Sequence, residues 1–315
     1  MSSAFTIDGD VSVLALPASF EFEGGSLSGA QLAYEVQGNP DGPLVCVLGG
    51  ISAGRHVAGF WEWLAGAGKP VDTRVSCVVG IDWLGGAGLS SGPRSSSLGW
   101  DFPAVSTRDQ ARALHALLPA LGRTRFDAII GASFGGMVAL AFAELFPREV
   151  SRLVVISAPA RSDPLASAWR SLQTSILELG RETGREERAL ALARGLALTT
   201  YRSRADWARR GGRAGVQSYL EARGREFVRR FDGAALALLS RATDTHAVDP
   251  RAIATPALVA GADTDLLVPW ESVEDLAREL AGPVELQRIV SAYGHDAFLK
   301  ETEQVGALVR RGGAA

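Results

Sequence analysis

The sequence has 315 residues, of which 47% are hydrophobic and 21% are charged, and its formal net charge is −3. A chain of this composition can bury a substantial core, which excludes intrinsic disorder and is compatible with one large α/β domain carrying an insertion or with two modest domains. The small net charge gives no electrostatic reason to expect binding to nucleic acid or to an anionic membrane.

The beginning of the chain and the two cysteines indicate a cytoplasmic protein. The first ten residues, MSSAFTIDGD, contain no basic region followed by a long apolar run, so we predict no signal peptide. The longest uncharged apolar run, residues 128–143, is too short to span a membrane. Cys46 and Cys77 lie in apolar strand-like segments. This favours buried free thiols in a reducing compartment over a disulfide or a metal site.

The first third of the chain predicts strands separated by glycine-rich loops. Residues 10–37 alternate apolar and polar side chains between glycine turns, which predicts antiparallel strands. Residues 44–48 form a continuous apolar run, as in a strand covered by helices on both faces. A loop of small residues, 49–54, follows it. Residues 74–81 predict the next buried strand, and a second glycine-rich loop follows at 84–93.

Helices then alternate with strands as far as residue 158. Residues 106–121 have helical periodicity and stop at Gly122. A short apolar strand at 126–130 precedes a helix that ends near Pro147, and residues 153–157 predict another strand. This alternation predicts a mostly parallel, doubly wound sheet.

A helical segment interrupts the pattern from about residue 160 to 248. We expect five helices in it, at residues 165–179, 188–201, 205–210, 216–230 and 234–241. Strands resume at 256–260 and 284–290, with helices at 273–280 and 296–310. We therefore predict a core domain made of residues 1–158 and 251–315, with residues 159–250 inserted as a helical lid that closes the active site to water.

The central motif is Gly131-Ala132-Ser133-Phe134-Gly135, between the strand at 126–130 and a helix. It fits G-x-S-x-G, the nucleophile elbow of the α/β-hydrolase fold. The sharp turn strains Ser133, and side chains at positions 131 and 135 would collide with neighbouring backbone. The following helix directs its N–H groups and positive dipole end at charge that develops on the substrate.

Of four histidines, His295 is the best candidate for the general base. It lies in Ser-Ala-Tyr-Gly-His-Asp just after the last predicted strand, where this fold places the catalytic imidazole. His115 lies within a predicted helix and is expected to be structural. His246 is expected to be a local cap or hydrogen-bond partner. His56 follows the first glycine loop and could approach the pocket.

The third member of the triad must hold the imidazole in the correct tautomer. Asp265 follows the preceding strand at a suitable distance and has the D-x-x-x-P spacing typical of this carboxylate, whereas Asp263 is expected to cap the turn. Two backbone N–H groups must bind the oxyanion, and we expect them from Phe134 and Ile51. These groups predict acyl transfer through an ester of Ser133, without specifying the acceptor.

Several blocks of the sequence resemble the homoserine O-acyltransferases, acyl-CoA enzymes of the α/β-hydrolase fold. They are GGISAGRHV (49–57), GKPVDTRVSCVVGIDWLGGAGLSSGP (68–93), FPAVSTRDQARALHALLPALG (102–122), GASFGGMVALAFA (131–143), TTYRS (199–203), VQSYLEARGREFVRRFDGAALALLSRATDTH (216–246), DLLVP (265–269) and YGHDAFLKE (293–301). The resemblance covers nearly the full chain, including the lid.

The resemblance implies roles for individual residues. Ser133, Asp265 and His295 match the family's triad, and Ile51 with Phe134 match its oxyanion donors. Arg202 corresponds to the lid arginine that binds the amino-acid carboxylate. Asp296 corresponds to the carboxylate that receives the substrate ammonium. A zwitterionic acceptor needs one fixed cation and one fixed anion, in agreement with both assignments.

The resemblance also implies the substrates and the assembly. No cofactor is expected to be bound permanently; acyl-CoA is the co-substrate, L-homoserine is the acceptor, and O-acyl-L-homoserine for methionine synthesis is the product. A homodimer formed through the lid is implied as well. Succinyl-CoA would bring a carboxylate, for which Arg55 is a candidate cation. Leu267, however, is apolar where an arginine accompanies succinyl use, which favours acetyl-CoA.

Three alternatives remain open. A serine esterase or thioesterase would use the same triad with water as the acceptor. L-Serine, one methylene shorter than homoserine, could be the acceptor, because discrimination of that size is only about 1–3 kcal/mol. The third alternative is a non-catalytic binding protein with the hydrolase fold, and the complete Ser-Asp-His set argues against it.

Overall fold

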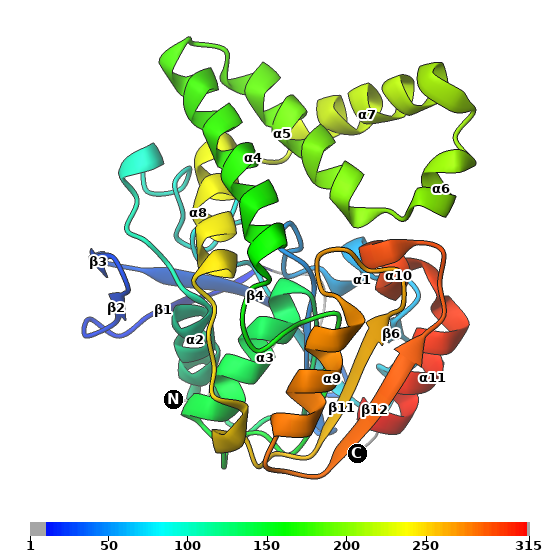
Figure 1. Ribbon diagram of the computed structural model, residues 1–315. Coiled ribbons are helices and arrows are strands. Elements are labelled where there is room, and N and C mark those ends of the chain that lie inside the picture. Colours follow the sequence, from blue (N-terminus) through cyan, green and yellow to red (C-terminus); the bar gives the residue numbers. More distant parts are fainter. Residues whose placement is uncertain (1–10, 314–315) are drawn as a thin grey trace.

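The computed structural model describes residues 11–313 and shows an eight-stranded sheet with helices on both faces (Figure 1). The segment for which we predict no signal peptide, residues 1–10, lies outside the described residues. The strands occur in the order β1 (Ser12–Ala15), β4 (Gln31–Gly38), β8 (Cys77–Ile81), β5 (Leu44–Leu48), β9 (Ala128–Ala132), β10 (Leu153–Ile156), β11 (Ala257–Ala262) and β12 (Val284–Ile289).

The sheet is mostly parallel, as predicted. β8, β5, β9, β10, β11 and β12 pair in parallel, whereas β1 pairs with β4 and β4 with β8 in antiparallel fashion. Two small sheets add β2 (Glu21–Phe22) with β3 (Gly25–Ser26), and β6 (Ala65–Gly66) with β7 (Val71–Asp72).

Alternate residues of each central strand face two separate cores, which is why these strands are apolar throughout. In β5, Cys46 and Leu48 belong to one core and Val45 and Val47 to the other. The first core is covered by α2 (Thr107–Ala120), α3 (Phe134–Leu145) and α9 (Trp270–Glu279). The second is covered by α1 (Val57–Phe60), α10 (Ala297–Lys300) and α11 (Thr302–Gly313).

An inserted helical region lies between β10 and β11, on the side toward which the arrows of β11 and β12 point (Figure 1). Its helices are α4 (Pro164–Glu182), α5 (Glu186–Tyr201), α6 (Arg204–Ala208), α7 (Gly212–Val228) and α8 (Gly233–Asp244). Three single turns of 3-10 helix complete the elements: η1 (Gly99–Asp101), η2 (Pro250–Ala252) and η3 (Gly294–Asp296). No helix in residues 11–313 is long and apolar enough to cross a membrane.

The prediction of one helix over residues 296–310 was wrong, because the segment is divided into η3, α10 and α11. The carbonyl oxygen of Phe298 accepts a hydrogen bond from the Trp61 indole at 2.9 Å, and that of Leu299 accepts one from Trp63 at 3.2 Å. These carbonyls are therefore bound to indole N–H groups, and the backbone leaves the helix at Glu301, where ψ is 65°. Before the break, Phe298 packs edge-on against His295, with ring centroids 5.8 Å apart.

Candidate active site

Ser133 lies at the turn between β9 and α3 in a conformation that favours glycine. Its φ is 55° and its ψ is −123°, and its amide donates to the Ile156 carbonyl at 2.9 Å. A Cβ at Gly131 would lie 2.3 Å from the Gly135 carbonyl oxygen, and one at Gly135 would lie 2.4 Å from that of Leu48. The predicted need for glycine at both positions is therefore confirmed, and the surrounding backbone holds the strained serine in place.

Ser133, His295 and Asp265 form one hydrogen-bonded chain. His295 Nε2 lies 2.8 Å from the Ser133 hydroxyl, and Nδ1 lies 2.7 Å from Asp265 Oδ2. A carboxylate only accepts, so the Nδ1–H donates to it and Nε2 is left to accept the serine proton. The other oxygen of Asp265 accepts from the amides of Leu267 at 2.9 Å and Val268 at 3.1 Å, which fixes the carboxylate.

The position of His295 gives it the properties of a base. Burial acts to lower its pKa, but the charge and hydrogen bond of Asp265, together with the charge of Asp296, outweigh burial and raise the pKa above its ordinary value. The rival carboxylate Asp263 does not contact the imidazole; it accepts from the Ser291 amide at 3.0 Å and braces the loop before His295.

The backbone at Ile51 and Phe134 lies beside the serine. Both residues line the same cavity as Ser133, and among the hydrogen bonds of residues 11–313 none is donated by either N–H. The flanking groups are fixed: the Gly135 amide donates to the Gly49 carbonyl at 2.9 Å, and the Trp83 indole donates to the Gly50 carbonyl at 3.1 Å. The two free N–H groups are thus available to an oxyanion.

The cavity has a volume of about 300 Å³ and lies between the sheet and the helical region. Its wall includes four apolar side chains, those of Ile51, Phe60, Leu267 and Phe298. Gln173, Thr200 and Ser240 from the helical region add polar groups.

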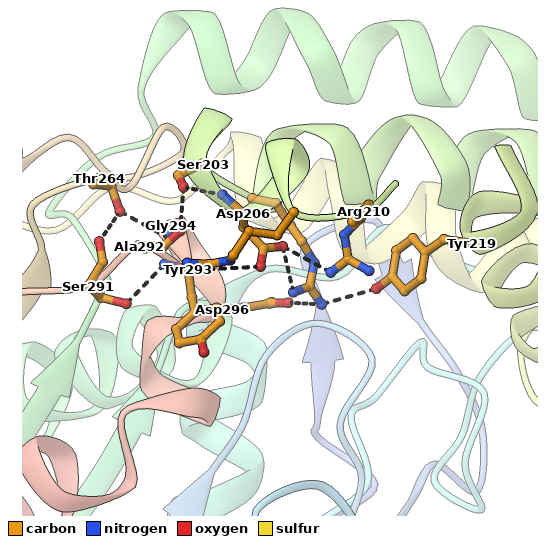
Figure 2. A network of polar contacts seen from close by, with 12 residues as sticks. Ser203, Asp206, Arg210, Tyr219, Thr264, Ser291, Ala292, Tyr293, Gly294 and Asp296 are labelled. Carbon is orange, nitrogen blue, oxygen red and sulfur yellow. Dashed lines mark hydrogen bonds and ion pairs between the residues drawn. The ribbon is translucent and has the colours of Figure 1, made fainter. Parts of the chain in front are cut away.

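Arg202 and Asp296 are brought together as an ion pair, with Arg202 Nη2 2.8 Å from Asp296 Oδ2 (Figure 2). Both residues are buried. Asp296 lines the cavity, whereas Arg202 does not and reaches it through Asp296. The loop that carries Arg202 lies directly against the histidine loop, because Ser203 donates to the Ala292 carbonyl.

Sequence reasoning missed the residues that hold Arg202. Asp206 accepts from Arg202 at 3.2 Å, from Arg209 at 3.3 Å and from Arg210 at 2.9 Å, and the Tyr219 hydroxyl lies 3.0 Å from Arg202 (Figure 2). Burial acts to raise the pKa of Asp206, but these three arginines outweigh it and lower the pKa. No helical periodicity signals these contacts, because Arg202 lies in extended backbone before α6 and Arg210 lies after its end, so only Asp206 is in the helix.

The structure does not bring Arg55 into the cavity. Its guanidinium lies 2.5 Å from Asp82, and its amide donates to the same carboxylate at 2.8 Å. Asp82 Oδ2 also accepts from the Leu89 amide at 2.7 Å. Arg55 therefore links the two glycine-rich loops, and its charge is compensated within the protein.

The remaining histidines and the cysteines lie away from the serine. His56 is half-exposed beside Glu35 at 2.9 Å, and His115 pairs with Glu149 at 2.7 Å. His246 is buried against the Thr107 hydroxyl at 2.8 Å, and burial lowers its pKa to about 3. Cys46 and Cys77 are free and buried, and burial raises the pKa of both thiols, so neither is a reactive thiolate.

Comparison with known proteins agrees with this geometry. Residues 43–302 match the family model described as the alpha/beta hydrolase fold. A homoserine O-succinyltransferase of Xanthomonas campestris pv. campestris is 36% identical over 89% of this chain and 78% of its own length. A homoserine O-acetyltransferase of Thermus thermophilus is 39% identical over 78% of this chain and 70% of its own. A serine O-succinyltransferase of Frateuria aurantia is 33% identical over 94% of this chain and 96% of its own.

Solved structures show the same fold. A homoserine O-acetyltransferase from Bacillus anthracis superposes with a TM-score of 0.86 at 19% identity, over 97% of this chain and 98% of that one. Esterase E22 superposes with a TM-score of 0.86 at 20% identity, over 96% and 99%. Because an acyltransferase and an esterase share this fold, the fold alone does not identify the acceptor. The sequence relatives decide the family: this chain belongs to the homoserine O-acyltransferase family of the α/β-hydrolase fold.

Proposed function

We propose that this protein is an L-homoserine O-acyltransferase that works in two steps through an acyl ester of Ser133. The observation that supports it best is the juxtaposition of His295, the base, with Asp296 and its partner Arg202. A hydrolase that uses water has no need of a buried cation and anion beside its base. A zwitterionic amino acid does, since its carboxylate and ammonium both require a partner.

In the first step, His295 Nε2 takes the hydroxyl proton of Ser133 as the oxygen attacks the thioester carbonyl of acyl-CoA. The N–H groups of Ile51 and Phe134 hold the oxyanion. The C–S bond then breaks, and His295 returns the proton to the leaving thiolate, so that free CoA departs. Asp265 holds the imidazole in the required tautomer and stabilises its charged form.

In the second step, the acceptor enters between Arg202 and Asp296. Its carboxylate replaces Asp296 as the partner of Arg202, and Asp296 turns to the substrate ammonium. His295 then takes the proton of the acceptor hydroxyl, whose oxygen attacks the ester. Ser133 leaves with that proton, and O-acyl-L-homoserine is released for methionine synthesis.

For the acyl donor we propose acetyl-CoA, with succinyl-CoA as the second candidate. Leu267 lines the cavity and provides an apolar surface, and Arg55, the cation considered for a succinyl group, is bound to Asp82. L-Serine remains the alternative acceptor, since the curated relatives include a serine O-succinyltransferase. We place the reaction in the cytoplasm.

We further propose that the protein is a homodimer through the lid, formed by residues 159–250. α4 carries three exposed leucines seven residues apart: Leu165, Leu172 and Leu179, with 56, 57 and 60% of their surface accessible. Seven-residue spacing keeps apolar side chains on one side of a helix, as in helix pairs between subunits. A second copy of the chain would cover this stripe.

The test of the mechanism is to trap the acyl-enzyme. Incubation with acyl-CoA and no acceptor should add one acyl group per chain, located on the peptide with Ser133 by mass spectrometry. Ser133→Ala should take up none and release no CoA. Full transfer by Ser133→Ala would rule the mechanism out.

A further inference from the structure

The cavity that contains Ser133 carries positive charge for which the protein supplies no counter-charge. Besides Tyr201, the titratable side chains on its wall are Arg170, Arg194, Arg230, His295 and Asp296. Three of the five have a partner of opposite charge: Arg170 lies 2.6 Å from Asp244, His295 lies 2.7 Å from Asp265, and Asp296 lies 2.8 Å from Arg202. Arg194 and Arg230 form no ion pair with any residue in the described part of the chain.

These two arginines lie beside the same aromatic ring, that of Phe227. The Arg194 guanidinium carbon is 4.7 Å from the centre of the Phe227 ring, and that of Arg230 is 6.0 Å from the same ring. Arg194 also lies 5.5 Å from the Tyr201 ring, which in turn is 5.8 Å from His295. A π-face attracts a guanidinium but does not cancel its charge, so both arginines keep their positive charge on the cavity wall.

Carboxylates close to them in the sequence have other partners. Glu226, one helical turn before Arg230, pairs with Arg223 at 2.6 Å. Asp232 accepts the Ala235 amide through Oδ1 at 2.8 Å and caps α8, and its buried Oδ2 forms no hydrogen bond with the described residues. Neither carboxylate forms an ion pair with Arg194 or Arg230, and two cations without an ion pair on one cavity wall favour an anion from outside.

We propose that Arg194 and Arg230 form a binding subsite for an oxyanion group of the acyl donor. The inference rests on the proposed acyl transfer. Planar guanidinium groups bind carboxylate and phosphate through paired hydrogen bonds. Two parts of an acyl-CoA have this chemistry: the phosphates of CoA, and the free carboxylate of a dicarboxylic acyl group such as succinyl.

The test compares three donors on Arg194→Gln and Arg230→Gln: acetyl-CoA, succinyl-CoA and S-acetylpantetheine, which has neither phosphate nor carboxylate. Arg188→Gln is the matched control, because Arg188 is an exposed arginine on α5 that does not line the cavity. Each cavity variant should lower kcat/KM about tenfold to a hundredfold for a donor whose oxyanion it binds, the range for one charged hydrogen bond. The control and the neutral donor should show no change.

The pattern of loss identifies the group. A loss with both CoA thioesters assigns the subsite to phosphate, and a loss with succinyl-CoA alone assigns it to carboxylate. Equal losses with S-acetylpantetheine, or no loss with any donor, would overturn the proposal.

A binding measurement without turnover tests the subsite independently of the proposed acyl transfer. Succinyl-CoA, which carries both kinds of oxyanion, can be titrated by calorimetry into Ser133→Ala and into Ser133→Ala with Arg194→Gln, without turnover. Weaker binding of succinyl-CoA by the double variant supports the subsite, whether or not the wild-type protein transfers an acyl group. Absence of acyl transfer by the wild-type protein would count against the proposed function alone. Equal affinity of the two proteins would overturn the subsite.

Discussion

Replacement of Arg202 by glutamine should weaken the binding of the amino-acid acceptor without affecting the reaction with the acyl donor. Arg202 is 8% exposed, and its guanidinium is bound by Asp296, Asp206 and Tyr219. In the proposed complex it exchanges Asp296 for the carboxylate of the acceptor. Loss of that charged hydrogen-bonded pair, worth about 2–3 kcal/mol, corresponds to roughly a hundredfold rise in the KM of L-homoserine.

The assay separates the two half-reactions. CoA release in a single turnover without acceptor should keep its wild-type rate in Arg202→Gln, because the donor step does not use this residue. Steady-state rates at varied L-homoserine should then show the increase in KM. A thermal melt checks that the variant is folded, since the change leaves Asp296 without its buried partner.

Arg210→Gln is the matched control. Arg210 binds the same carboxylate, Asp206, at 2.9 Å but forms no ion pair with Asp296. It should change the KM of the acceptor much less than Arg202→Gln does. An unchanged KM in Arg202→Gln, or equal effects of the two variants, would refute the assignment of Arg202 to the acceptor carboxylate.

Three further predictions follow from the same structure. Acylation requires neutral His295, and its surroundings raise the pKa of this imidazole above its ordinary value, so the rate of CoA release should fall as pH decreases with a midpoint above 6.5. Asp265→Asn should lower the midpoint of the residual activity, and a wild-type midpoint below 6.5 would contradict this. Gly135→Ala should lower the melting temperature and abolish activity, because the added Cβ would lie 2.4 Å from a carbonyl oxygen. The control Gly195→Ala, whose Cβ would point into open space inside α5, should stabilise the protein by about 0.5–1 kcal/mol, and equal melting temperatures of the two variants would show that the elbow is not tightly packed. Leu172→Glu should convert a dimer to a monomer in light scattering, and a monomeric wild type would refute the lid interface.

The strands and the elbow could be predicted because their signals are local. Residues 44–48 are apolar without interruption because both faces are buried, and the strand occupies those same residues. The glycines at 131 and 135 are required by backbone within the turn and by the adjacent strand β5. Because such patterns depend only on residues adjacent in the sequence, the mostly parallel sheet and the inserted helices were predicted correctly.

Features that depend on distant partners could not be predicted in this way. The break at Glu301 arises because Trp61 and Trp63, more than two hundred positions away, bond to the helix carbonyls. Arg55 was considered for the substrate because nothing local showed that Asp82 binds it. Asp206 was missed because it holds the guanidinium of Arg202 against Asp296, and that contact joins two separate segments of the chain.

The most direct test of acyl transfer to an amino acid is thiol release from acetyl-CoA and from succinyl-CoA, each measured with no acceptor, with L-homoserine and with L-serine. Our account predicts continuous release only when L-homoserine is present, and with acetyl-CoA faster than with succinyl-CoA. Without an acceptor it predicts a single release of one thiol per active site as the acyl-enzyme forms. Continuous release at the same rate with no amino acid present would mean that water is the acceptor, and the protein would then be a thioesterase.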